Sequence, residues 1–251
     1  MSVVRIVQLY PDLLGVTGDR GNVDVLAARA RLSGLEPETV FVGPGDEAPL
    51  EADVVVIGNG PLSAIRAVRD DLVSRREWLD AQRAAGAVIL AVGGGAELLA
   101  EGIDLLDGTT IDGLGLVPAR VSRTRTRRVG YVVADTPDGR LVGFEDHASV
   151  WKLGAQAESG IRYGTVVAGN GSIEGGGETL RADGVYATNV QGPVLPLNPQ
   201  LADAILERAV ARRGVVYATG PEHELVDLHA RAARAEIERL AANKHFTAIQ
   251  L

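Results

Sequence analysis

A glycine-rich turn offers the first sign of chemistry in this chain. Residues 87–92 are all apolar, the pattern of a buried parallel strand, and Gly93, Gly94 and Gly95 follow directly before a segment with helical apolar spacing. A strand that turns sharply into a helix displays one reactive side chain beside free backbone N–H groups, which lower a thiol pKa and can hold an oxyanion. Gly93 stands where that side chain belongs. The turn therefore predicts the geometry of a reactive site without its nucleophile.

Few other residues could supply catalytic groups or metal ligands. The chain has no Cys, which excludes disulfides, thiolate zinc sites and a cysteine nucleophile. Glu97 falls one turn into the predicted helix, and we interpret it as a surface or capping charge. The sequence Glu145-Asp-His147 is the nearest approach to a cluster of acid and imidazole. His223 and His229 lack the helical spacing that would aim both at one metal, so we expect no metal site and no cofactor.

The first hundred residues alternate between β-type and α-type segments. The pattern predicts strands over 3–9, 38–42, 52–57 and 87–92, and helices over 23–32 and 62–85. Such alternation predicts a parallel sheet with right-handed crossovers. Ligands of these sheets bind beyond the carboxyl ends of the strands, so the glycine turns at Gly58 and Gly93 should face one cleft.

From about Ile103 the pattern changes to short β-type segments separated by turns. We expect strands over 114–117, 129–134, 141–144, 149–153, 165–168 and 184–190, with a glycine-rich loop over 170–177. The change favours continuation of the sheet over a domain boundary. The fold class is therefore α/β, with a mostly parallel sheet flanked by helices and extra β segments in the second half.

The C-terminal part is helical. A helix over 199–213 ends at Gly214, and a long charged helix is predicted over 222–243. We assign residues 1–214 to one α/β domain and 215–251 to a helical tail. The apolar residues of the second helix could form a stripe: Leu225, Leu228, Ala232, Ala235, Ile237 and Leu240. Packing on its own domain and contact with another subunit both stay open for this stripe.

Composition narrows the class of protein. The chain has 251 residues, of which 46% are hydrophobic, so a large core is available. Its net charge of -8 makes it a poor nucleic-acid binder, because phosphate neutralisation needs clustered Lys and Arg. The arginine-rich segment 120–128 is an exception that we interpret as a solvated loop or an edge strand. With no apolar run near the roughly 20 residues that span a bilayer, and no signal peptide in residues 1–7, we expect no membrane insertion and a cytoplasmic location.

Several motifs together resemble one protein family. They are Leu9-Tyr-Pro-Asp-Leu-Leu14, Gly18-Asp-Arg-Gly-Asn22, the glycine turn, Gly113-Leu-Gly-Leu116, Gly143-Phe-Glu-Asp-His147 and Gly192-Pro-Val-Leu-Pro-Leu-Asn-Pro199. The chain resembles the class I glutamine amidotransferases of the cobyric-acid-synthase-like branch, and within it the GatD-type glutaminase subunits. Those subunits work with Mur-ligase-like, MurT-type proteins to amidate lipid II. The resemblance implies a flavodoxin-like sheet.

The resemblance also identifies two vacated catalytic positions. In this family the turn reads Cys-Gly-Gly, and the Cys attacks the glutamine side-chain amide, forms a thioester and releases ammonia. Aligning the turns puts Gly93 at the Cys. The late family motif Thr-Tyr-Leu-His-Gly-Pro falls on residues 188–193 and puts Gln191 at the His, but an amide has no basic nitrogen. Nucleophile and base act as a unit, so we expect no catalytic residue for glutamine hydrolysis.

Binding groups are better preserved than catalytic ones. Arg127 falls where the family has an arginine that contacts glutamine, and its planar fork suits a carboxylate. Gly94 and Gly60 fall at the turn and at the loop beside it, where the family places oxyanion contacts. That loop departs from the family pattern Gly-Gly-Gly-Gln-Asp and reads Gly58-Asn-Gly-Pro-Leu62. An amino-acid or glutamine-like ligand at Arg127 is one interpretation, and a plain surface charge is the other.

These features imply a catalytically degenerate GatD-like subunit. Its partner would be a MurT-type protein in peptidoglycan (lipid II) amidation or a related pathway. Two alternatives stay open. The chain could belong to an active ATP-dependent ligase that uses free ammonia or another amine donor, or it could be a stand-alone amino-acid-binding module.

Overall fold

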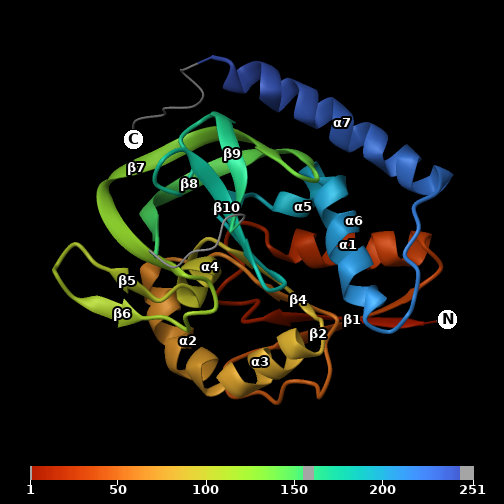
Figure 1. Cartoon of the computed structure of the whole chain (residues 1–251), viewed down its shortest axis with the longest axis horizontal. Helices are drawn as coiled ribbons and strands as arrows, with labels where there is room; N and C mark the ends of the chain where they lie inside the picture. Colours follow the sequence, from red (N-terminus) through yellow and green to blue (C-terminus); the bar gives the residue numbers. More distant parts are fainter. Residues whose placement is uncertain (1, 155–160, 244–251) are drawn as a thin grey trace.

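A single mixed sheet organises the chain (Figure 1). The computed structural model describes residues 2–154 and 161–243, and within these ranges the sheet has twelve strands. The strands are β1 (Val3–Leu9), β2 (Glu36–Val42), β3 (Val54–Ile57), β4 (Val88–Val92), β5 (Gly102–Asp104), β6 (Thr110–Asp112), β7 (Ala119–Thr136), β8 (Gly139–Leu153), β9 (Arg162–Ala168), β10 (Gly177–Ala182), β11 (Val185–Thr188) and β12 (Val190–Gln191). Their order is β12-β8-β7-β9-β10-β11-β4-β3-β1-β2, with β5 paired to β6 and β7.

The parallel half of the sheet comprises β2, β1, β3, β4 and β11. Its register pairs Ile57 with Ala91 and Thr188 with Val92, so the carboxyl ends of β3, β4 and β11 meet at one edge. Alternate residues of β4 enter two different cores, since Ile89 belongs to one and Leu90 to the other. A strand buried on both faces needs a continuous apolar run, which is why the sequence pattern identified it.

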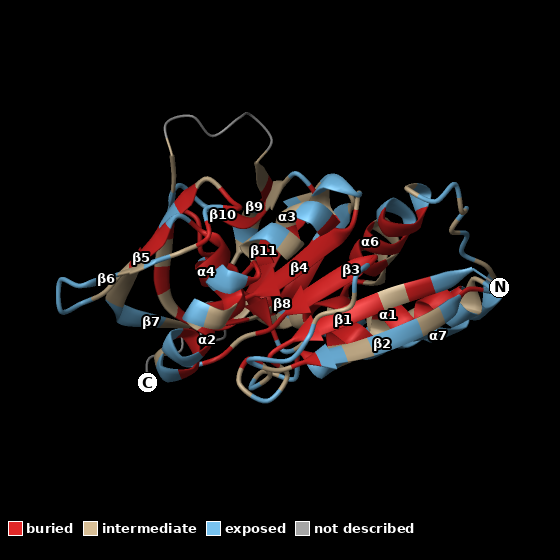
Figure 2. Ribbon diagram, turned by 90° about the horizontal axis from the view of Figure 1, so that it is seen from below, coloured by how far each residue is buried: buried red, intermediate tan, exposed pale blue. Residues whose placement is uncertain are grey.

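Helices cover both faces of this half, and Figure 2 shows the buried strands between them. They are α1 (Arg20–Leu32), α2 (Leu62–Ser74), α3 (Arg76–Ala84), α4 (Gly94–Leu99), α5 (Val194–Leu197), α6 (Pro199–Ala211) and α7 (Pro221–Ala241). Side chains of α2 and α3 pack into the core that contains Ile89. Those of α1 and α6 pack into the core that contains Leu90. No described helix is both long and apolar enough to cross a lipid bilayer.

The prediction of one helix over 62–85 is wrong, because α2 and α3 meet at Arg75. The guanidinium of Arg75 donates to the carboxylate of Asp71 at 2.6 Å and to the carbonyl of Asp46 at 2.8 Å. These bonds tie the break in the helix to the loop that follows β2. Helical spacing continues across the break, so the pattern alone could not show it.

The second half extends the sheet with a long hairpin of β7 and β8. The segments 141–144 and 149–153 belong to the single strand β8, and 114–117 is a loop, so three strand predictions need correction. The segment 120–128 is part of β7. Residues 120–122 pair with β5 on one side and β8 on the other, so this part is not an edge strand, whereas β9 pairs with β7 only at residues 133–135. The pairing passes from Arg123–Ser149 to Arg128–His147, so residues 124–127 form a wide bulge opposite Ala148.

One face of α7 packs on the rest of the chain, beside β7 and β8 (Figure 1). Arg29 pairs with Asp227 of α7 at 2.6 Å, and Ile237 packs against a small buried cluster. The predicted single stripe is therefore wrong, because Ile237 faces inward while Leu225 and Leu228 are 64% and 54% exposed. Residues 244–251 of the predicted tail lie outside the described residues. The division of the chain at residue 214 stays a prediction.

Candidate functional site

The predicted strand–turn–helix element is confirmed. Strand β4 ends at Val92, and α4 begins at Gly94. Between them Gly93 has φ +50° and ψ -117°, a conformation that residues with a side chain rarely adopt. A Cβ at Gly95 would lie 2.6 Å from the carbonyl oxygen of Gly58, so the turn also needs glycine to pack against the end of β3. The sharp backbone of a nucleophile-bearing turn is present here without a nucleophile.

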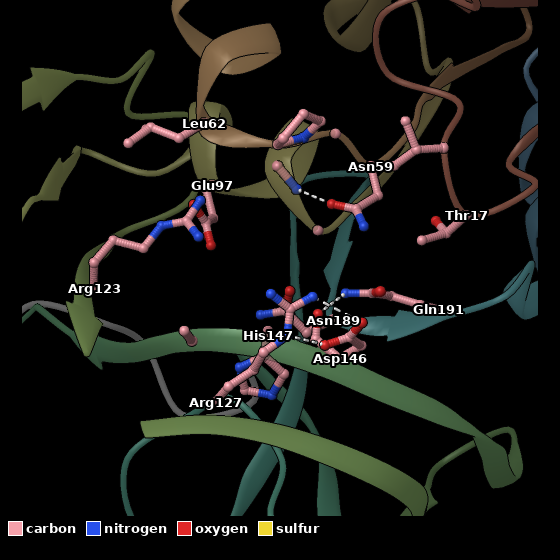
Figure 3. A pocket seen from close by; sticks show the side chains of 16 residues that line it. Thr17, Asn59, Leu62, Glu97, Arg123, Arg127, Asp146, His147, Asn189 and Gln191 are labelled. Carbon is pink, nitrogen blue, oxygen red and sulfur yellow. Dashed lines mark hydrogen bonds and ion pairs between the residues drawn. The ribbon is translucent and has the colours of Figure 1, made fainter. Parts of the chain in front are cut away.

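A cavity of about 540 Å³ lies over this turn (Figure 3). We call it the elbow cavity. Its walls come from the loop after β3, the bulge of β7, the middle of β8 and the segment from β11 to β12. The vacated positions and the binding residues expected from the resemblance all line it: Gly60, Gly93, Gly94, Arg127 and Gln191. The expectation that the two glycine turns face one cleft is confirmed.

Asn59 occupies the space that a side chain at Gly93 would need. A Cβ built on Gly93 would lie 2.1 Å from Oδ1 of Asn59, well inside van der Waals contact. The backbone N–H of Gly94 donates to the same oxygen at 2.8 Å (Figure 3). The N–H after a nucleophile is an oxyanion donor in such turns, and here a protein side chain already uses it. The sequence analysis missed Asn59, although the altered loop at Gly58 was the feature that could have revealed it.

Arg127 lines the cavity with its guanidinium already paired. Its Nε and Nη2 donate to the two carboxylate oxygens of Asp146 at 2.5 and 2.9 Å. These bonds raise the pKa of Arg127 above its usual value. A ligand carboxylate could use the same fork only by displacing Asp146.

The expectation that Glu97 is a surface or capping charge is wrong. Its side chain is 2% exposed and lines the cavity, where it accepts a hydrogen bond from Nη2 of Arg123 at 2.5 Å. Burial raises the pKa of Glu97, and the charge of Arg123 opposes that rise. Every residue of α4 is buried, so a helical position that is normally solvated lies inside the molecule. The two ion pairs, with Arg127 and with Arg123, leave the cavity wall electrically balanced.

Glu145 and His147 share one face of β8 and hold a neighbouring loop. Two backbone N–H groups donate to the carboxylate of Glu145, from Asn170 at 2.7 Å and from Gly171 at 2.9 Å. Nε2 of His147 lies 3.4 Å from the same carboxylate, and Nδ1 lies 3.1 Å from the carbonyl oxygen of Ser149. Burial would raise the pKa of Glu145, but these contacts outweigh it and lower the pKa. Glu145 thus orders the loop, whereas His147 lines the elbow cavity (Figure 3).

Two amide side chains in the cavity wall have polar atoms without partners. Gln191 donates through Nε2 to the carbonyl of Asp146 at 3.2 Å, but its Oε1 is unpaired. Both amide atoms of Asn189 are buried and also unpaired among the described residues. Buried polar atoms normally have a hydrogen-bond partner, so these atoms mark where a polar molecule can bind.

His223 and His229 do not line this cavity. His223 lies in the first turn of α7 and is buried, and its Nε2 lies 3.2 Å from the carbonyl oxygen of Arg29. His229 is exposed on the same helix. Over residues 2–154 and 161–243, no three His, Asp or Glu side chains gather as metal ligands would.

Comparison with known proteins agrees with this geometry. Residues 5–196 match the model of the CobB/CobQ-like glutamine amidotransferase domain. The GatD subunit of lipid II isoglutaminyl synthase (glutamine-hydrolyzing) from Staphylococcus aureus is 26% identical over 86% of this chain and 88% of its own. The corresponding subunit from Streptococcus pneumoniae is 27% identical over 84% of this chain and 82% of its own.

Solved structures share the fold at low sequence identity. A glutamine amidotransferase from Thermotoga maritima has a TM-score of 0.50 and 14% identity, and covers 94% of each chain. PurLQS from the same organism also has a TM-score of 0.50, with 13% identity over 84% of this chain and 97% of its own. The fold is that of the class I glutamine amidotransferases. The chain belongs to the CobB/CobQ-like glutamine amidotransferase family, and it contains no cysteine.

Proposed function

We propose that this protein is a catalytically silent, GatD-like subunit of an amide-forming complex in the cytoplasm. The single observation that carries the proposal is a complete nucleophile turn whose reactive position is Gly93, in a chain without any Cys. The partner would be a Mur-ligase-like, MurT-type protein, acting on lipid II or a related substrate. The two relatives named as subunits of lipid II isoglutaminyl synthase support this assignment.

The chemistry of the cavity supports loss of glutaminase activity. Hydrolysis of glutamine through a thioester needs a thiolate, an imidazole that takes its proton, and free N–H donors for the oxyanion. The turn has no thiol, Gln191 offers an amide in place of imidazole, and the N–H of Gly94 is bonded to Asn59. A partner that still forms amides would therefore take ammonia from solution or from another source.

A stand-alone amino-acid-binding role is less well supported. The fork that would hold an α-carboxylate is bound to Asp146, and the cavity wall carries no surplus positive charge to attract one. The unpaired amide atoms of Asn189 and Gln191 favour a neutral hydrogen-bonding molecule over a carboxylate.

Co-expression tests the proposal directly. The chain is produced with the Mur-ligase-like protein encoded nearest to its own gene, and the purified material is supplied with ATP, lipid II and either ammonium or glutamine. We expect a stable complex that forms amidated product with ammonium and none with glutamine. An active GatD–MurT pair is the positive control for glutamine, since the synthase of the two relatives is named as glutamine-hydrolyzing. Failure of the two chains to associate, or product formed from glutamine, contradicts the proposal.

A further inference from the structure

Asn59 has a role that extends beyond filling space. We propose that its side chain is an internal carboxamide ligand of the turn, which excludes the carboxamide groups of other molecules from the N–H of Gly94. The proposal rests on the absence of glutaminase chemistry argued above, but it concerns the isolated chain and needs no partner. It makes Asn59 the residue that determines which ligands the elbow cavity accepts.

The chemical match between Asn59 and an amide substrate is close. The side chain of Asn59 ends in a primary carboxamide, the same group that ends glutamine. Its carbonyl oxygen accepts the N–H of Gly94 at 2.8 Å, as the carbonyl of a bound amide would at such a turn. Its Cγ would lie 2.4 Å from a Cβ on Gly93, so the group stands where a nucleophile and its substrate would meet.

Asn59 is held in this position from the side opposite the turn. Its backbone N–H donates to Oδ2 of Asp19 at 3.0 Å, and its carbonyl accepts the N–H of Val16 at 3.2 Å. Asp19 is fully buried and also accepts the hydroxyl of Thr17 at 2.9 Å. Burial raises the pKa of Asp19, and the bond from Asn59 opposes that rise. The backbone of Asn59 therefore cannot withdraw from the turn without breaking buried hydrogen bonds.

Gly58, the residue before Asn59, packs tightly against neighbouring segments and fixes the backbone of the loop. A Cβ at Gly58 would lie 2.0 Å from the carbonyl oxygen of Leu14 and 2.6 Å from Cβ of Asp19. The loop after β3 is thus wedged between residues 14–19 and the turn. Such a fixed backbone leaves the side chain of Asn59 pre-organised against Gly94, and no added ligand has to order it.

The rest of the elbow cavity remains available to a ligand while Asn59 is bonded to the N–H of Gly94. Its unpaired acceptor on Gln191 and both unpaired atoms of Asn189 belong to the same wall. A molecule held by those groups needs no contact with Gly94. An amide such as glutamine loses its contact with the turn, and the cost of displacing Asn59 is added to its binding free energy.

The test uses the full-length chain labelled with ¹⁵N, followed by NMR at the backbone amide of Gly94. Asn59→Gly removes the carboxamide, and Asn59→Asp keeps an acceptor of the same shape. Ser63→Ala, at an exposed position of α2, is the matched control. Each protein is titrated with L-glutamine and with L-norvaline, which has the same amino-acid end but no carboxamide. Asn59→Ala replaces the glycine variant if the latter does not fold.

In the unaltered chain and in Ser63→Ala, we expect no response of Gly94 to either ligand. Asn59→Gly should exchange its Gly94 amide proton about fivefold faster, the effect of losing one hydrogen bond of about 1 kcal/mol. Its Gly94 resonance should then shift with glutamine and not with norvaline. Asn59→Asp should keep the slow exchange and ignore glutamine.

Three results would overturn the proposal. One is a glutamine-dependent shift of Gly94 in the unaltered chain that matches the variant. Another is unchanged exchange in Asn59→Gly. The last is faster exchange without any response to glutamine, which would make Asn59 a structural cap only. None of these results depends on a ligase, so a failure here is distinct from a failure of the two chains to form a complex.

Discussion

Two groups of buried polar side chains lie close together in this molecule and differ in how well they are satisfied. Behind the cavity, the carboxylate of Glu178 accepts hydrogen bonds from six donors. In the cavity wall, neither amide atom of the Asn189 side chain has a partner among the described residues, and Oε1 of Gln191 also lacks one. Glu178 even binds the backbone N–H of Asn189 at 2.9 Å. The hydrogen bonds of the buried carboxylate are therefore satisfied, whereas those of the amides in the cavity wall are not.

This difference separates the structural role of a polar residue from its chemical role. A buried carboxylate with several donors holds loops in place, and it is needed whether or not the site reacts. The side chain of Asn189, whose amide atoms have no partner among the described residues, holds no other segment in place. The two groups should therefore respond in opposite ways to substitution.

Replacing Glu178 should have the largest effect. Glu178→Gln puts an NH₂ group against N–H and O–H donors from Ser172, Thr179 and Thr188, so we expect a loss of about 3 kcal/mol in the free energy of unfolding. Chemical denaturation followed by circular dichroism measures it. Glu174→Gln, at an exposed position nearby, is the control and should change stability by less than about 0.5 kcal/mol. Equal effects of the two substitutions would remove the distinction drawn here.

A side chain at the turn should have the next largest effect. Gly93→Ala must adopt a positive φ and also meets Asn59, so we expect a loss of about 2 kcal/mol. Combining it with Asn59→Gly should recover the part caused by the collision and leave the part caused by the backbone. A double-mutant cycle of unfolding free energies measures this coupling. Strict additivity of the two substitutions would show that the side chains do not meet.

Glu145 should make stability depend on pH. Its pKa in the folded chain is lowered from the usual 4.5, so its carboxylate stabilises the fold above that pH, and the contribution disappears as the pH falls through the lower folded value. Glu145→Gln should lose about 1.5 kcal/mol at pH 7. Below pH 4.5 its deficit relative to the unaltered chain should shrink. A deficit that stays constant across thermal unfolding at pH 7, 5 and 4 would contradict this assignment.

Replacing Asn189, the amide residue in the cavity wall, should have the smallest effect on the free energy of unfolding. Asn189→Leu removes two unpaired polar atoms and keeps the backbone bond to Glu178, so we expect stability to stay within about 0.5 kcal/mol or to rise. Denaturant titration of the purified variant measures it. A loss as large as that of Glu178→Gln would show that Asn189 is bound to something that holds the fold.

Much of the parallel half could be predicted from sequence. Residues 87–92 are buried on both faces, and a run without polar residues identifies such a strand directly. The glycine turn was equally clear, because a close approach such as that of Gly95 to Gly58 permits no side chain. The gathering of Gly93, Gln191 and Arg127 in one cavity followed from the order of the strands and from the resemblance to the family.

What could not be predicted depends on contacts between distant segments. The length of β7 and β8 was hidden by polar residues that face the cavity or hold a loop, such as Glu145 and His147. The burial of Glu97 depends on Arg123, from another strand. The residues around Asn59 are typical of a loop. The role of its side chain, which accepts the N–H of Gly94, depends on a segment that is distant in sequence. Local patterns carry no information about such pairs.

The most direct measurement is glutamate release from glutamine by the purified chain, alone and with the proposed Mur-ligase-like partner, beside an active GatD–MurT pair under the same conditions. Because the chain has no thiol to attack the amide, it should release glutamate at the rate of the protein-free blank in both states. Release above that blank, if it scales with the concentration of this chain, would contradict the account.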